Sequence, residues 1–226
     1  MVAVLEKIVF KDFSVEGTCD LFHYGVTYDC LFGWLSHFEI YAGTLNGIVG
    51  EFGTGGAILS YILSNNRKFY EGKIYIDDKK EMLSSIVKNS WYIGYDIYGS
   101  HRPLWRKTIK EQIADGVQLS YIDLNVDAIQ DMFEISEVGA KKSIQKAGFE
   151  RWKASIAIGF AYGKKIFCYP WMNSKDIESL KEQMTQSIKV LIDNNCIVIL
   201  PTTKEKNITQ LSSKYHIVNV EYVKQY

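Results

Sequence analysis

The stretch whose residue types best fit a chemical task is the glycine-rich segment GEFGTGGA at residues 50–57. An apolar run of strand character precedes it, and an apolar run with helical spacing follows it. Backbone N–H groups at the start of a helix bind anions without any side chain, and glycines let the chain curl closely around the ligand. The layout is that of a phosphate-binding loop, G-x-x-x-x-G-K-[ST]. The candidate nucleotide-binding residues are Gly50, Gly53, Thr54, Gly55, Gly56 and Ala57.

The same loop lacks the side chains that phosphate chemistry uses. Gly56 stands at the lysine position of the pattern, and Ala57 stands at the serine or threonine position. In such loops the lysine contacts the β- and γ-phosphates, and the hydroxyl binds Mg²⁺. Glu51 adds a negative charge beside the place where a phosphate would lie. The loop alone leaves two interpretations open, an altered nucleotide site and a tight turn with no ligand.

Two further strand ends are candidates for catalytic groups. In a nucleotide hydrolase, a carboxylate for Mg²⁺ and a glutamate that orients water would follow the strand at 165–169. Pro170 and Trp171 stand there, and neither can do this chemistry, so we interpret the segment as a buried strand with an aromatic plug. A histidine contacting a γ-phosphate would follow the strand at 196–200. Thr203 stands there, in a Thr-Thr pair that is typical of a helix N-cap.

Charge, cysteine content and hydropathy argue against several classes of function. Lys plus Arg equals Asp plus Glu at 26 each, so no global charge attracts nucleic acid or an anionic membrane. The four cysteines show neither C-x-x-C pairs nor metal-ligand spacing, which predicts free thiols in a reducing compartment and no metal site. No stretch approaches the roughly 20 apolar residues of a membrane span, and no signal peptide is visible. We expect any membrane association to go through a partner.

Hydrophobic periodicity predicts the elements that position these residues. We expect an edge strand at 4–10 and an irregular, aromatic-rich segment at 11–35. The other predicted strands are 38–41, 45–49, 73–78, 91–95, 165–169, 196–200 and 217–220, and the predicted helices are 57–63, 104–114, 125–135, 149–162, 176–192 and 204–211. Strand and helix alternate early and late in the chain, with helices between, which predicts an α/β core around a mainly parallel sheet.

The order of these elements resembles the ATP-binding subunit of ABC transporters, from about residue 4 to about 222. EGKIYI at 71–76 is similar to that family's GxIxIDG strand, and YIGYDIY at 92–98 resembles the strand that leads to its Q-loop. KAGFE at 146–150 occupies the place of the LSGGQ motif, and KASIAIGFAY at 153–162 resembles the helix after it.

The resemblance implies a P-loop NTPase-like (RecA-like) fold, with a mainly parallel core sheet, an antiparallel edge sheet and an inserted helical subdomain. It implies one domain over residues 1–226, with a core at about 1–98 and 163–226 and the helical subdomain at about 99–162. ATP with Mg²⁺ is the ligand that the resemblance implies, although no cofactor follows from the residues themselves.

The resemblance also implies which positions carry the family's chemistry. Besides Gly56 and Ala57, the degenerate family positions are Tyr98, Ala147, Gly148, Pro170, Trp171 and Thr203. The lysine, the Mg²⁺ ligands, the glutamate and the histidine are all replaced, and phosphoryl transfer depends on such groups. We therefore expect no useful ATP hydrolysis by the family mechanism, and we assign no catalytic residue.

Three functional hypotheses remain open. The first is a catalytically degenerate subunit of an ABC transporter complex, cytoplasmic and peripheral to the membrane, that docks on a membrane-spanning subunit. It would form a homodimer, or a heterodimer with an intact ATPase whose nucleotide faces residues 146–150, and it would bind no nucleic acid. The second is a working ATPase that uses displaced residues, with Lys68, Lys73 or Arg67 as the candidates. The third is a free-standing scaffold with residual anion binding. The expected partner interface comprises Tyr98, His101, Arg102 and Trp105.

Overall fold

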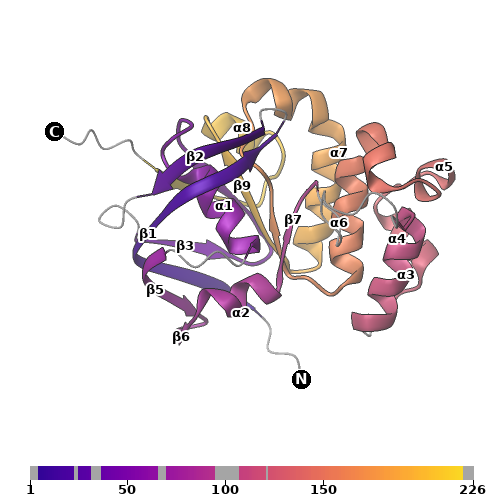
Figure 1. The fold of residues 1–226 in the computed structure, drawn as a ribbon, viewed down its shortest axis with the longest axis horizontal. Helices are drawn as coiled ribbons and strands as arrows, with labels where there is room; N and C mark the ends of the chain where they lie inside the picture. The colour runs from indigo at the N-terminus through magenta and orange to yellow at the C-terminus, as the bar shows by residue number, and fades with distance from the viewer. Residues whose placement is uncertain are drawn as a thin grey trace.

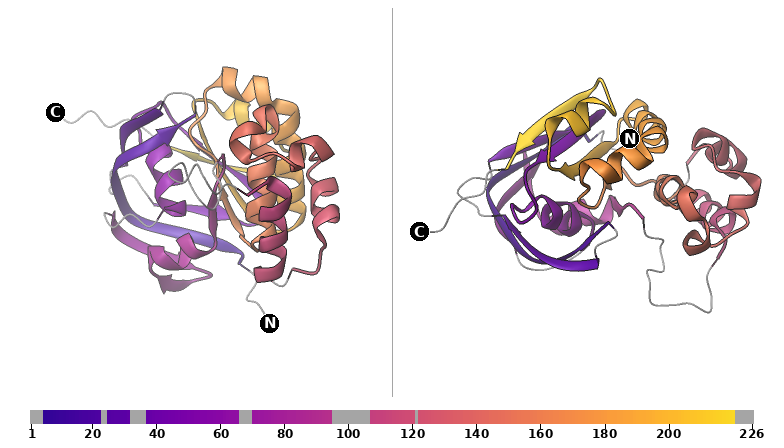
Figure 2. Two further views of the ribbon diagram at one scale, coloured as in Figure 1. Left: turned by 45° about the vertical axis from the view of Figure 1, so that its right-hand side comes forward. Right: turned by 90° about the horizontal axis from the view of Figure 1, so that it is seen from above.

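A computed structural model describes residues 5–22, 25–31, 37–65, 70–94, 107–120 and 122–220 of the chain. Within these residues the strands form two five-stranded sheets. Helix α1 lies between the two sheets, and a group of helices lies at the far end of the molecule (Figures 1 and 2). The arrangement is α/β, as predicted from the alternation of strands and helices.

The parallel sheet carries the predicted buried strands. Its order is β10 (Tyr215–Asn219), β4 (Thr44–Val49), β9 (Ile197–Thr202), β8 (Ile166–Cys168) and β7 (Ser90–Tyr92). Every neighbouring pair in it is parallel. Every residue of β8 and β9 is buried, which agrees with their unbroken apolar sequences.

The antiparallel sheet corrects two predictions about the first 35 residues. It contains β1 (Lys7–Leu21), β2 (Gly25–Leu31), β3 (Phe38–Tyr41), β5 (Tyr70–Ile76) and β6 (Lys79–Glu81). Strand β1 is not an edge strand, because β2, β3 and β5 all pair with it. The described part of 11–35 is not irregular either. Its alternating buried residues Phe13, Val15 and Cys19 continue β1, a period-two signal that the polar and glycine residues between them obscure.

The faces of the parallel sheet pack against different helices. Helix α1 (Gly56–Ser64) covers one face, together with the antiparallel sheet, and buries Ile197 and Ile199 of β9. Helix α7 (Ser174–Asp193) packs with Val198 and Leu200 from the same strand. The alternation along β9 shows why its sequence is apolar on both faces.

Helices fill the described residues between β7 and β8. They are α3 (Ile109–Ser120), α4 (Val126–Met132), α5 (Glu137–Ala140) and α6 (Arg151–Ala161), with single turns of 3₁₀ helix at Ile144–Lys146 and Gly148–Glu150. The amphipathic stripe predicted for 104–114 belongs to α3, where Ile109 and Ile113 are fully buried. The helix begins later than expected and continues to Ser120, while 104–106 lie outside the described residues.

Three elements complete the core. Helix α2 (Leu83–Lys88) was not predicted, and neither was the short strand β6. Helix α8 (Glu205–Thr209) follows β9, inside the helix predicted for 204–211. In the described residues, no helix is both long and apolar enough to cross a membrane.

The four cysteines are free thiols, as expected. Cys19, Cys168 and Cys196 are buried, and Cys30 is half-buried. Burial raises the pKa of the Cys196 thiol to about 11 and raises the pKa of Cys168 further still. Thiols held in the neutral form in this way behave as small hydrophobic side chains.

Candidate functional site

The glycine loop joins the carboxyl end of β4 to the first turn of α1. Gly53 and Gly55 adopt positive φ angles of 95° and 98°, which favour glycine. The Thr54 hydroxyl donates a 2.7 Å hydrogen bond to the Glu51 carbonyl oxygen, and the Gly50 amide donates to the Thr202 carbonyl oxygen at 2.9 Å. The loop is therefore a closed turn tied to the neighbouring strand β9.

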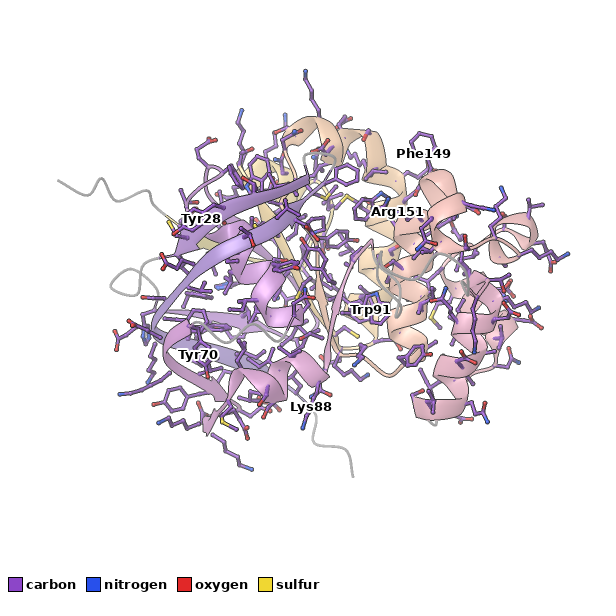
Figure 3. The ribbon with its side chains drawn as sticks, viewed as in Figure 1. Tyr28, Tyr70, Lys88, Trp91, Phe149 and Arg151 are labelled. Carbon is purple, nitrogen blue, oxygen red and sulfur yellow. The ribbon has the colours of Figure 1, made fainter. Side chains whose placement is uncertain are left out.

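A carboxyl group from the antiparallel sheet fills the amino end of α1. The Gly55 amide donates to Oδ1 of Asp29 at 2.9 Å, and the Ile58 amide donates to Oδ2 at 2.9 Å. Asp29 lies on β2 and is only 1% exposed. The next residue toward the amino terminus, Tyr28, points outward on β2 and is labelled in Figure 3. Two of the N–H groups that could bind an anion at this helix start are thus already paired inside the chain.

The environment of Asp29 acts on its ionisation in two opposite ways. Burial raises the pKa of the Asp29 carboxyl above its ordinary value, because the charged form loses its hydration. The backbone amides of Ile58 and Gly55 lower this pKa, since they stabilise the charged form. The effect of burial is the larger one, so the pKa of Asp29 is raised overall.

Asp29 is not among the predicted site residues, because the sequence predicts an irregular segment at 11–35. Asp29 and Leu31 are the buried residues of β2, whereas Val26 and Tyr28 are exposed. The apolar pattern of GVTYDCL therefore favours the wrong face, and it gives no signal for an inward carboxyl. An acidic residue on the buried face of a strand needs donors, and a helix start supplies them.

The two positions that open α1 carry no polar side chain. A Cβ atom on Gly56 would lie 3.2 Å from Cβ of Pro201 and 3.4 Å from Cγ2 of Ile48, so this position is closely packed. The Ala57 methyl group is 1% exposed and belongs to the core between the sheets. The start of the helix offers backbone amides, without a cation or a hydroxyl at these two residues.

The structure brings the predicted strand-end residues close to the loop. Pro170 and Trp171 follow β8 and are buried. The Trp171 ring meets the Phe52 ring of the loop edge-to-face, with centroids 5.6 Å apart. Its Nε1 is buried and has no hydrogen-bond partner among the residues that the structure describes. The predicted aromatic plug is present, and Phe52, which was not predicted to take part, contributes its ring.

Thr203 follows β9 and is half-buried, but the predicted N-cap is wrong. Lys204 is the residue that precedes α8, and it makes no side-chain capping bond. The hydroxyl of Thr202 donates instead to the Met172 carbonyl oxygen at 2.8 Å and accepts a 2.7 Å bond from Asn207. This buried bonding links the ends of β8 and β9.

Ala147 and Gly148 lie away from the loop, just before α6. Ala147 is buried, while Gly148 has a positive φ of 58° and is exposed. Phe149 is 76% exposed and stands at the helical end of the molecule, with Arg151 nearby (Figure 3). Gly148, Phe149 and Arg151 border a hollow of about 230 Å³ that Phe22 and Trp152 also line.

The expected interface residues Tyr98, His101, Arg102 and Trp105 lie outside the described residues. Among the residues that the structure does describe, no group of three or more His, Cys, Asp and Glu side chains is arranged to hold a metal ion.

Solved structures share this arrangement of sheets and helices. An ABC transporter ATP-binding protein from Pyrococcus furiosus, itself described as putative, has a TM-score of 0.62 at 16% identity, covering 95% of this chain and 97% of that one. The dimeric structure of a bacterial ABC transporter cassette has a TM-score of 0.61 at 19% identity, covering 96% and 97%. This chain has the fold of an ABC transporter ATP-binding cassette. The cassette fold confirms the predicted fold class, including the parallel sheet, the antiparallel sheet and the helices between β7 and β8.

Two longer proteins contain a region similar to this cassette. An ATP-bound bacterial Atm1-family ABC exporter has a TM-score of 0.62 at 17% identity, and the match covers 98% of this chain but 38% of the exporter chain. A curated relative, described as a putative ABC transporter ATP-binding protein from Clostridium tetani, is 22% identical over 167 residues. That match covers 73% of this chain and 38% of the relative. No family model matches the sequence.

Proposed function

We propose that this chain is a catalytically degenerate cassette of an ABC transporter complex, acting as a structural or regulatory subunit. The observation that carries the proposal is the start of α1. Its first two positions are Gly56 and Ala57, and the amides of Gly55 and Ile58 donate to Asp29. Phosphoryl transfer needs cations, metal ligands and a positioned water. The residues at the positions where these groups are expected are Gly56, Ala57, Pro170, Trp171 and Thr203.

The alternative of an ATPase with displaced residues gains no support from the described geometry. Lys73 is exposed on β5, in the antiparallel sheet, where it is paired in register with Lys11 of β1. Both belong to the sheet that lies across α1 from the strand ends of β8 and β9 (Figure 1).

The proposed complex contains a membrane-spanning subunit and a second cassette, either a copy of this chain or an intact ATPase. The chain would stay on the cytoplasmic side, held to the membrane through the membrane-spanning subunit. We assign the core to about 1–98 and 163–226, and the helical subdomain to about 99–162. The exposed Phe149 and the hollow beside it support a protein contact at this end, because exposed aromatic side chains are frequent anchors of interfaces.

A capture experiment tests this proposal through Phe149. Tagged wild-type protein, purified from detergent-solubilised cells, should retain a membrane-spanning transporter subunit and a cassette with a complete phosphate loop, both identified by mass spectrometry. Phe149→Ser should reduce capture of the second cassette about 30-fold, because losing an aromatic anchor costs about 2 kcal/mol.

The control is Leu119→Ser on α3, which removes a side chain that is 67% exposed at the surface. Capture by this variant should equal that of the wild type. Purification of the wild type with neither a membrane-spanning subunit nor a second cassette would contradict the proposed function.

A further inference from the structure

Asp29 sits where the backbone of the loop would hold a phosphate. Its two oxygens accept from the amides of Gly55 and Ile58, one amide each. The amides at the start of a helix carry a partial positive charge and are the groups that bind phosphate in nucleotide loops. Helix α1 runs from Gly56 to Ser64, and the Asp29 carboxyl pairs with the residue just before it and with its third residue.

Strand β2 closes over the same amides. A Cβ atom placed on Gly55 would lie 2.4 Å from Cβ of Leu31 and 2.6 Å from the carbonyl oxygen of Cys30. The Cys30 thiol lies 3.9 Å from the carbonyl oxygen of Gly53. The chain that carries Asp29 is therefore packed directly on the loop, and Asp29 itself is 1% exposed. A phosphate cannot reach these amides while Asp29 occupies them.

The bonding is specific to this carboxyl. Glu16 on β1, also acidic and nearby in the same sheet, is exposed and accepts a hydrogen bond from the Tyr28 hydroxyl at 2.8 Å. It does not contact the loop in any hydrogen bond that the described residues form. Of the two carboxylates, only Asp29 bonds to the helix start.

We infer that Asp29 is an internal substitute for phosphate, and that it competes with phosphate-class anions for the amides of Gly55 and Ile58. This inference deepens the proposed function and rests on it. An internal carboxylate on the loop amides explains how the loop of a cassette fold stays ordered without nucleotide. The amides remain competent to bind an anion, and the ligand they hold is part of the chain.

The test compares binding of inorganic pyrophosphate to the wild type, to Asp29→Ala and to Glu16→Gln, followed by calorimetry and by thermal unfolding. Asp29→Ala should bind pyrophosphate about 10- to 100-fold more tightly than the wild type, because the anion no longer displaces two hydrogen bonds to a charged group. Glu16→Gln removes the same charge from the sheet without freeing the loop, and it should bind as the wild type does.

Equal pyrophosphate affinity for the wild type and Asp29→Ala would overturn the inference. Amide hydrogen exchange in the wild type gives a second test that needs no variant to fold. The amides of Gly55 and Ile58 should be protected, and pyrophosphate should leave their exchange unchanged. Rapid exchange at these two amides would also overturn it. Neither of these two results would contradict the proposed function, because the capture of partner subunits tests that function separately.

Discussion

Replacing Gly55 with alanine should lower the free energy of unfolding by about 3 to 5 kcal/mol. The φ of 98° at Gly55 is unfavourable for alanine, and the new methyl group would lie 2.4 Å from Cβ of Leu31. Backbone of β2 stands in the way as well, since the Cys30 carbonyl oxygen is 2.6 Å from the same point. Strand and loop must separate, which also breaks the bonds to Asp29. Denaturant unfolding measures the loss.

Gly53→Ala is the matched control, because Gly53 has a φ of 95° but no atom within 4 Å of the added methyl group. It should cost only the conformational strain, about 1 to 2 kcal/mol. The difference between the two variants isolates the packing of β2 on the loop. Equal losses for Gly53→Ala and Gly55→Ala would show that β2 does not lie against the loop.

Replacing Trp91 with alanine should cost about 3 to 5 kcal/mol, the range for removing a large buried aromatic side chain. Trp91 is 8% exposed and joins β7 to α6 (Figure 3). A Cβ atom on Gly159 would lie 2.5 Å from Cγ of Trp91, so the ring rests on the helix where a glycine makes room. Its Nε1 donates to the Ser155 hydroxyl at 3.1 Å. Denaturant unfolding is again the measurement.

Trp91→Phe separates the ring from the hydrogen bond. It keeps most of the apolar contact but removes the donor to Ser155, so it should cost about 1 to 2 kcal/mol. Ser155 still accepts from the Gly94 amide at 2.9 Å in this variant. If Trp91→Ala lowered the free energy of unfolding no more than Trp91→Phe does, the packing of β7 on α6 would not depend on the aromatic ring.

The buried strands and long helices of the cassette fold were predictable, because their apolar periodicity is strong and local. The runs at 165–169 and 196–200 gave β8 and β9, and the stripe at 176–192 gave α7. The hairpin of β1 and β2 was not predictable in this way. Its inward residues Phe13, Val15 and Cys19 are separated by polar residues and a glycine, and their pairing depends on the neighbouring strands.

The sequence predicted the loop of the candidate site but not the residues that pack on it. The glycine spacing at 50–57 located the loop and the start of α1, since helix and strand signals flank it. Asp29 was not visible, because it lies 26 residues before Gly55 and meets it only through the packing of two sheets on one helix. The Phe52–Trp171 contact is likewise a product of tertiary structure.

The proposed function requires that this chain does not hydrolyse ATP. The most direct test is phosphate release from purified protein in saturating Mg-ATP. We expect release at the rate of a protein-free blank, because the loop supplies neither cation nor Mg²⁺ ligand at Gly56 and Ala57. The contrary result is phosphate release above the blank that co-purifies with the protein and is abolished by Gly53→Asp, a substitution on the open side of the loop. That result would contradict the absence of ATP hydrolysis.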